Sequence, residues 1–365
     1  MNVKVRKDVL LDWYYAMKNK DFETADRMKQ EIDTAEQDVS DFEMKALYKL
    51  MAARYHLMYK DLVKFSSVIA ELDLNTNNDR YWLTYYYHFF RGIYHYERQE
   101  YKLSLDFYNR ARLHVFNQDA EEVGEFYYRL AATYLRTYKI TLTIEYAKKA
   151  LGIFKSSHNY KRMSGCEMIL GICNQDIFQY NEAEKHYQDA LIIAEKTQDE
   201  LLKARVLHNL GVLYSELNEH KNAIHYLTQG QKLFKNNDLY LITQNLFQLA
   251  KNYIKLDHIM EALKMLDKGL RLSKENDYLT YYYRCKLLKT KFFEPQHFET
   301  IYKEGIEYYK EHEEWQLVVE YSDELGAYYG GIGKFQEAYE YLLLSIEART
   351  KIERERGLSN ETFDS

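Results

Sequence analysis

The sequence predicts an all-α protein built from stacked helical hairpins, and three observations support this prediction. The chain of 365 residues contains one proline and 14 glycines, which leaves few of the breaks that a sheet-rich fold needs. Its 37 tyrosines are interspersed with helix-forming Glu, Lys, Leu and Ala, a mixture that suits helices packed through aromatic seams. A short pattern of small and aromatic residues also recurs along most of the chain.

The recurring pattern places small residues at fixed offsets from Tyr and other large side chains. Clear copies begin at Ala131, Gly171, Gly211, Ala250 and Gly326, and a weaker copy begins at Gly92. Small residues are needed where two helices of a hairpin cross, because a larger side chain would push the backbones apart. Equivalent positions from Ala111 to Gly269 are 39 or 40 residues apart, compared with about 34 in a standard tetratricopeptide unit. The pattern therefore predicts a tetratricopeptide-type array with lengthened helices or loops.

Two segments depart from this pattern. We expect a degenerate helix pair between Tyr281 and Tyr309, with Pro295 in its turn, because proline cannot continue a helix. Residues 1–75 read instead as three or four amphipathic helices, and the polar segment 73–79 predicts a hinge. We therefore expect an N-terminal helical bundle over residues 1–75 and a repeat domain over residues 76–365.

Charge and composition argue against several classes of function. The net charge of −6 is spread over 50 basic and 56 acidic residues, so we expect no direct nucleic-acid ligand. Three cysteines without C-x-x-C spacing predict buried thiols in a reducing compartment. No leader-like segment or apolar run of about 18 residues is apparent, which predicts a cytoplasmic protein without a membrane partner.

Motifs for metal or cofactor binding are also missing from the sequence. Several histidines lie close together, but no metal-ligand spacing connects them, and we expect them to be surface or packing residues. These histidines are His186, His208, His220 and His225. No nucleotide-binding or catalytic signature can be assembled, so we expect no metal and no cofactor. The tyrosine runs 85–87 and 281–283 could stack on a ligand, but we expect them to fill seams between helices.

Beyond the array, short segments near the N-terminus and in the middle of the chain carry a more specific resemblance. They are Asp12-Trp13-Tyr14, Leu50-Met51-Ala52-Ala53-Arg54, the aromatic run 85–94 and Gln179-Tyr180-Asn181-Glu182-Ala183. Together they resemble the Rap family, the response regulator aspartate phosphatases of spore-forming Gram-positive bacteria. The resemblance implies an N-terminal three-helix bundle followed by a right-handed tetratricopeptide-repeat superhelix. It also implies that the bundle binds a response regulator and that the concave repeat surface binds a short imported Phr signalling peptide.

The resemblance also bears on catalysis, through the start of the third helix. Aligned backward from Arg54, Phe42 falls where the family carries a glutamine credited with positioning the water that attacks the phospho-aspartate. Phenylalanine cannot orient a water, and Gln37 would need an insertion to take this place. The sequence therefore favours partner binding, with an active phosphatase of a sporulation phosphorelay regulator as the alternative. A peptide-sensing transcription factor is disfavoured, because residues 1–75 lack a basic recognition helix.

Three polar residues are candidates for peptide contact. Asp176, Asn209 and Gln248 fall on the first helices of successive repeats, at positions that resemble the family's peptide-binding residues. An amide can clamp an extended peptide backbone through donor and acceptor together, and Asp176 could pair with the basic residue typical of Phr peptides. The alternative is that all three are solvated polar groups of the groove.

Overall fold

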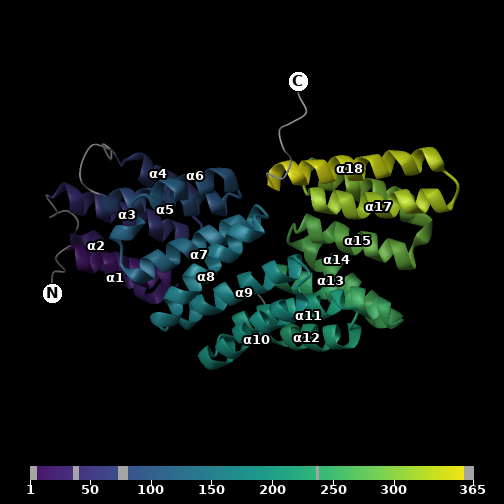
Figure 1. Cartoon of the computed structure of the whole chain (residues 1–365), viewed down its shortest axis with the longest axis horizontal. Helices are drawn as coiled ribbons and strands as arrows, with labels where there is room; N and C mark the ends of the chain where they lie inside the picture. The colour runs from purple at the N-terminus through teal and green to yellow at the C-terminus, as the bar shows by residue number, and fades with distance from the viewer. Residues whose placement is uncertain (1–5, 36–40, 73–80, 236–237, 357–365) are drawn as a thin grey trace, which may run out of the picture. The chain divides into compact units, whose positions relative to one another are not determined.

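The computed structural model describes residues 6–35, 41–72, 81–235 and 238–356 (Figure 1). Across these ranges the chain is α-helical, with short 3₁₀ turns and no strand. The helices in chain order are α1 (Lys7–Lys18), α2 (Phe22–Ala35), α3 (Phe42–Met58), α4 (Leu62–Ala70), α5 (Tyr81–Glu97), α6 (Tyr101–Arg112), α7 (Ala120–Arg136), α8 (Ile140–Ser156), α9 (Tyr160–Asp176), α10 (Tyr180–Thr197), α11 (Glu200–Glu216), α12 (His220–Leu233), α13 (Leu239–Lys255), α14 (Ile259–Glu275), α15 (Leu279–Phe293), α16 (Phe298–Glu311), α17 (Trp315–Gly331) and α18 (Phe335–Arg356). The all-α prediction is confirmed.

The chain folds into two compact units. An N-terminal unit spans Met1–Arg162 and a C-terminal unit spans Met163–Ser365. Four helices, α1 to α4, precede the first repeat hairpin, α5 and α6. The predicted hinge at 73–79 lies outside the described residues.

Small residues set the packing of the hairpins, as the sequence pattern predicts. A Cβ atom added to Gly92 would lie 2.4 Å from the ring of Tyr108, and one added to Gly171 would lie 2.4 Å from the ring of Tyr187. Both rings are buried, because each fills the space that the glycine leaves between the two helices. The tetratricopeptide-type hairpin is therefore present from α5 onward.

The turn inside most of the described hairpins repeats one backbone geometry. A residue in the left-handed region ends the first helix of six hairpins, at Gln99, Tyr138, Phe178, Asn218, Asp257 and Gly333. At Phe178 the turn is closed by two hydrogen bonds, in which the Phe178 N–H donates to the Gln175 carbonyl (2.9 Å) and the Gln179 N–H donates to the Asn174 carbonyl (2.8 Å). This pattern is a Schellman motif, which satisfies the last carbonyls of the helix.

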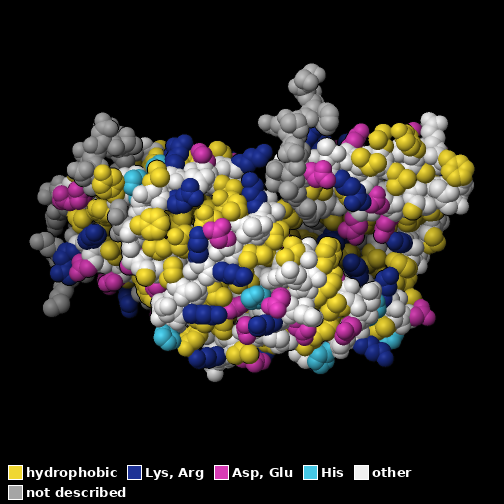
Figure 2. Space-filling model, in the orientation of Figure 1, with side chains coloured by type: hydrophobic (Ala, Val, Ile, Leu, Met, Phe, Trp, Pro, Cys, Tyr) yellow, Lys and Arg dark blue, Asp and Glu magenta, His cyan; other side chains and the backbone are white. Residues whose placement is uncertain are grey.

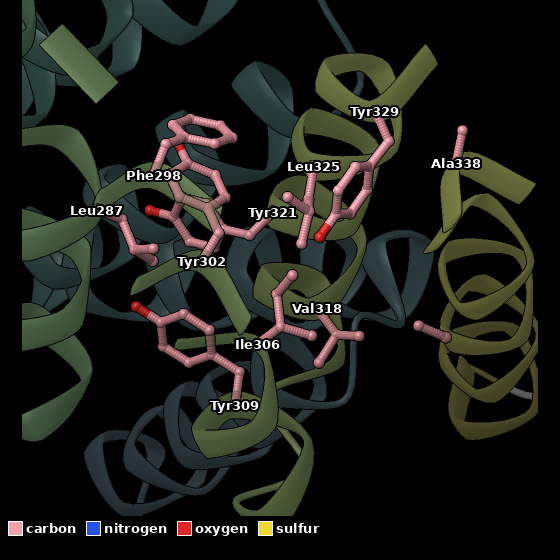
Figure 3. Close-up of a cluster of buried hydrophobic side chains, with 11 residues drawn as sticks. Leu287, Phe298, Tyr302, Ile306, Tyr309, Val318, Tyr321, Leu325, Tyr329 and Ala338 are labelled. Atoms are coloured by element: carbon pink, nitrogen blue, oxygen red, sulfur yellow. The ribbon is translucent and has the colours of Figure 1, made fainter. Parts of the chain in front are cut away.

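The degenerate helix pair predicted around Pro295 is also confirmed. Pro295 begins a 3₁₀ turn, Pro295–His297, between α15 and α16. Tyrosines fill the core that follows, where Tyr302, Tyr309 and Tyr329 are buried with Leu325 between α16, α17 and α18 (Figure 3). Aromatic side chains therefore occupy the seams here.

Within the N-terminal unit, α1 joins the first repeats through a buried carboxylate. Glu122 of α7 is 1% exposed and accepts hydrogen bonds from the hydroxyls of Tyr14 (2.8 Å) and Tyr85 (2.9 Å). The Lys18 ammonium group donates to the second Glu122 oxygen at 3.1 Å. Buried charge is tolerated here because the carboxylate has both an ionic partner and neutral donors.

A second buried carboxylate lies one turn further along α7. Glu125 pairs with the guanidinium groups of Arg129 (3.0 Å) and Arg162 (2.6 Å). Burial alone would raise the pKa of Glu125, but these two cations lower it to about 2. Arg162 also donates to the Lys18 carbonyl at 3.3 Å. The last residue of α1 is therefore bonded through both its backbone, to Arg162, and its side chain, to Glu122.

The three cysteines, Cys166, Cys173 and Cys285, are buried thiols as predicted. Burial raises the pKa of Cys173 to about 12, with the charge of Asp176 acting in the same direction. Among the described residues, no helix has the length and apolar character required to cross a bilayer.

Candidate functional site

The C-terminal ends of α9 and α11 each carry a carboxylate, and the two charges influence each other. Asp176, the last residue of α9, is exposed, and its charge acts on Glu216, the last residue of α11. Burial raises the pKa of Glu216, a hydrogen bond from Gln175 opposes this shift, and the Asp176 charge adds to it. Gln175 is itself fixed, because its Oε1 accepts from the Tyr187 hydroxyl at 2.9 Å. We call Asp176 and Glu216 the acidic corner.

The other two residues predicted from the sequence lie further along the same set of first helices. Asn209 on α11 and Gln248 on α13 are both half-buried, and each stands two residues before the small residue of its repeat. Within the described parts of the chain, neither side-chain amide makes a hydrogen bond; only the Gln248 backbone carbonyl accepts one from a side chain, that of Asn252, at 2.9 Å. Both amides can therefore donate to and accept from a ligand backbone.

Neighbouring polar residues, in contrast, use their side chains in hydrogen bonds within the protein. Asn245 is fully buried, donates to the Leu227 carbonyl at 2.9 Å, and bonds His208 Nδ1 at 2.9 Å through its Oδ1. His220 Nδ1 is likewise 2.9 Å from the Asn252 Oδ1. These bonds account for His208 and His220 as the packing residues that the sequence predicts.

A cavity of about 270 Å³ opens in the same unit, among α13, α15, α16 and α17. It is lined by Phe247, Lys251, Ile254, Lys255, Leu288, Lys291, Phe292, Tyr302, Glu320, Tyr321 and Glu324. Burial lowers the pKa of Lys251; the charge of Glu320 opposes this shift, and that of Arg284 adds to it. We call this space the mixed-charge cavity.

Two ion pairs lie at the mixed-charge cavity, one of them formed by Arg284, which is next to the lining residues Phe247 and Glu320. The Arg284 guanidinium lies 4.4 Å from the centre of the Phe247 ring and 3.9 Å from Glu320. Lys291 pairs with Glu324 at 2.8 Å, and the Tyr302 hydroxyl donates to the same carboxylate. A ligand carboxylate that binds Lys291 here has to replace Glu324.

The acidic corner and the mixed-charge cavity are electrostatically linked through Lys251, whose ammonium group interacts with both Glu216 and Glu320. Asn209 and Glu216 lie on α11, Gln248 and Lys251 on α13, and Glu320 and Glu324 on α17, each the first helix of a repeat. We call these residues, together with Asp176 of α9, the polar row. Sequence reasoning missed Glu216, Lys251 and Glu324. A positional signal existed for two of them: Glu324 stands two residues before Gly326, as Gln248 does before its small residue, and Glu216 occupies the place of Asp176 in the next repeat.

The N-terminal candidate position lies at the start of α3. Phe42 is the first residue of this helix and is 52% exposed. The preceding Asp41 caps the helix, since its carboxylate accepts from the Met44 N–H at 2.9 Å. Gln37 lies outside the described residues. The side chain at position 42 is therefore at the surface, and a phenyl ring has no donor or acceptor for water.

Comparison with known proteins places these features in a family. Residues 5–60 match the family model for the N-terminal region of response regulator aspartate phosphatase H, and residues 167–236 match the tetratricopeptide repeat. The transcriptional activator NprA of Geobacillus stearothermophilus is 30% identical over 350 residues, covering 93% of this chain and 86% of NprA. Response regulator aspartate phosphatase I of Bacillus subtilis is 26% identical over 367 residues, covering 98% of this chain and 93% of that protein.

The fold is shared with a solved relative. The crystal structure of a Rap protein complexed with competence and sporulation factor superposes with a TM-score of 0.79 at 22% identity, covering 95% of this chain and 98% of that one. Matches of both sequence and fold over nearly the whole chain, together with the N-terminal match, show that this chain belongs to the Rap family of tetratricopeptide-repeat regulators.

Proposed function

We propose that this chain is a cytoplasmic, peptide-controlled regulator that binds a bacterial response regulator through residues 1–75 and a short signalling peptide through residues 76–365. The observation that carries the proposal is the polar row, in which the amides of Asn209 and Gln248 accompany an acidic corner and a charged cavity. A solved Rap relative forms a complex with competence and sporulation factor, which supports a bound ligand in this chain as well.

The charges of the polar row define the chemistry of the peptide. An extended peptide presents alternating N–H and C=O groups, which the amides of Asn209 and Gln248 can bind as paired donor and acceptor. A basic side chain fits the acidic corner, where Asp176 is exposed and Glu216 adds charge. A terminal carboxylate fits the cations of the mixed-charge cavity, Lys251 and Lys291.

Calorimetry tests this assignment with short synthetic peptides that carry Arg at the second position, compared with the same peptides carrying Ala there. Asp176→Asn removes a charge-assisted hydrogen bond worth about 1.5–3 kcal/mol, so the affinity for the Arg peptides falls at least about tenfold. Glu182→Gln, at an exposed acid in the first turn of α10, is the matched control and leaves the affinity unchanged. An Arg peptide that binds Asp176→Asn as tightly as the native chain refutes the role of the acidic corner.

Control by the peptide requires that the peptide bind a contracted conformation of the repeats better than the conformation that binds the partner. Peptide and response regulator should then weaken each other's binding by the same factor. Titration of peptide into a preformed complex of the chain with a response regulator measures this coupling. A ternary complex with undiminished affinities contradicts the proposal.

For the N-terminal helices we propose binding without efficient hydrolysis. A phospho-aspartate hydrolyses in the regulator's own Mg²⁺ site, and a helper protein adds catalysis mainly by positioning the attacking water. Because Phe42 offers no hydrogen-bonding group, the chain should accelerate phosphate loss by less than about tenfold, a barrier change near 1.4 kcal/mol. Decay of radiolabelled phosphate on candidate regulators distinguishes this outcome from the alternative, an active phosphatase.

One relative favours a second candidate function, control of transcription. NprA, at 30% identity, is a transcriptional activator. Electrophoretic mobility shifts with promoter fragments separate the two functions, because a regulator that acts only through proteins gives no shift at physiological salt. A sequence-specific shift by the purified chain would favour the second candidate.

A further inference from the structure

Arg54 of α3 is a buried cation whose charge is not matched by an anion of its own. It is 5% exposed, and among the described residues its Nε has no hydrogen-bond partner. On the surface of the molecule, in contrast, Lys and Arg side chains reach solvent among Asp and Glu (Figure 2). A guanidinium stays protonated even when it is buried, so Arg54 cannot avoid the cost of losing its hydration by losing its charge.

The carboxylate whose charge acts most on Arg54, that of Glu125, is already used by two other cations. Its Oε1 accepts from the Arg129 Nε at 3.0 Å and from the Arg162 Nη2 at 2.9 Å. The Arg162 Nε lies 2.6 Å from its Oε2. Three guanidinium groups therefore surround one carboxylate, which leaves an excess of two positive charges in the interior of the N-terminal unit.

The other polar neighbour of Arg54 does not supply the missing negative charge. Burial raises the pKa of Tyr14, and the charge of Glu122 acts in the same direction, so the phenol stays neutral. The Tyr14 hydroxyl donates to Glu122, and that carboxylate is paired with Lys18 at 3.1 Å. The excess of positive charge around Arg54 therefore remains uncompensated within this group of side chains.

We propose that Arg54 binds a small monovalent inorganic anion, of which chloride is the type, inside the N-terminal unit between α3 and α7. The site is too buried for the anion to keep its water, and the cost of losing that water rises with the square of the charge. A monovalent ion is therefore favoured over phosphate or sulfate. The guanidinium group is itself weakly hydrated, which suits pairing inside the protein. This inference does not depend on the proposed function.

Such an anion would stabilise the packing of an N-terminal helix against the repeats. Arg54 comes from α3, whereas Arg129 and Arg162 come from α7 and from the first turn of α9. An anion that binds the folded chain and not the unfolded one lowers the unfolding equilibrium constant as its concentration rises. A dissociation constant of about 100 mM or tighter makes that constant fall at least about fivefold between about 5 and 500 mM chloride.

Urea unfolding of the full-length protein tests this dependence. Sodium gluconate, whose anion is too large for a buried site, replaces sodium chloride at constant ionic strength. Tryptophan fluorescence is the readout, because Trp13 and Trp82, two of the three tryptophans, belong to the N-terminal unit. The native chain should show the fivefold effect and Arg54→Met should lose it. Arg27→Met, at an exposed arginine of α2, is the matched control and should keep the native dependence.

The sign of the mutational effect gives a second readout. Arg54→Met should be less stable than the native chain in high chloride. In low chloride it should be at least as stable, because replacing an unpaired buried charge by an apolar side chain is neutral or stabilising. A native stability that does not depend on chloride, or a dependence that Arg54→Met retains, overturns the proposal.

Anomalous diffraction locates the ion directly and needs no variant, so it decides the question even if Arg54→Met does not fold. Crystals of the native protein grown with bromide in place of chloride should show an anomalous peak against the Arg54 guanidinium. A water molecule without anomalous signal at that position overturns the proposal.

Discussion

Replacing Gly171 with alanine tests whether close helix contact in the repeats is as strict as the structure indicates. The new Cβ would lie 2.4 Å from one carbon of the Tyr187 ring and 2.6 Å from the next. Displacing the Tyr187 ring would cost packing and a hydrogen bond, because the ring is 1% exposed and its hydroxyl donates to Gln175 at 2.9 Å. Overpacking of this kind costs about 1–3 kcal/mol, and the 2.4 Å approach puts it at the upper end.

The better helix propensity of alanine offsets about 1 kcal/mol of that cost, which leaves a net loss of about 2 kcal/mol. Gly152→Ala is the control, since nothing lies within 4 Å of its added Cβ, and this variant should gain about 0.5–1 kcal/mol. Urea unfolding followed by far-ultraviolet circular dichroism compares the two midpoints. Tyr187→Ala should cost less in the Gly171→Ala background than in the native chain, because it removes the clash.

Equal stability of Gly171→Ala and Gly152→Ala would refute the packing argument. The same variant also has a functional consequence, because Tyr187 holds Gln175, which in turn bonds Glu216. A shifted ring should therefore lower affinity for a basic peptide, even though position 171 does not belong to the polar row.

Three further predictions concern the N-terminal unit. Lys18→Met leaves the Glu122 carboxylate buried without its cation, so the free energy of unfolding, measured in urea, should fall by about 3 kcal/mol. The double variant Lys18→Met/Glu122→Gln should recover at least half of that loss. Phe42→Gln supplies a group that can orient water and should raise the decay of radiolabelled regulator phosphate by more than about tenfold if the helices dock as in the family. Burial lowers the pKa of His88 to about 4, with the charges of Arg110 and Arg91 acting in the same direction. As the pH is lowered from about 6.5 to 4, the unfolded chain takes up a proton at His88 and the folded chain does not, so the free energy of unfolding should decrease over that range, and His88→Leu should flatten the slope.

The hairpins could be predicted from the sequence because their contacts leave a local signature. A glycine such as Gly171 and a ring such as Tyr187 recur at a fixed spacing, since the crossing of two helices requires a small residue opposite a large one. The turn at Pro295 was predictable for a similarly local reason, because proline lacks the N–H that a continuing helix needs.

The buried charges could not be predicted in this way. Tyr14 and Glu122 are 108 residues apart, and neither differs in type from residues that commonly lie on the surface. In the candidate site, the placement of Asp176 on a first helix follows from the repeat pattern, but its electrostatic coupling to Glu216 depends on how neighbouring helix ends approach each other. Residues that are far apart in the sequence and come into contact only in the folded chain show no fixed sequence spacing, so their contacts could not be predicted.

The carboxylates buried on α7 also bear on how the N-terminal helices come apart. Repeat arrays usually fray from their ends, one hairpin at a time, because each unit contacts only its neighbours. Detaching α1 would break the bond between Lys18 and Glu122 and the bond from Arg162 to the Lys18 carbonyl in the same step. Helix α1 should therefore open only together with the first repeats, as one cooperative unit, and its amide hydrogens should exchange as slowly as those of α7.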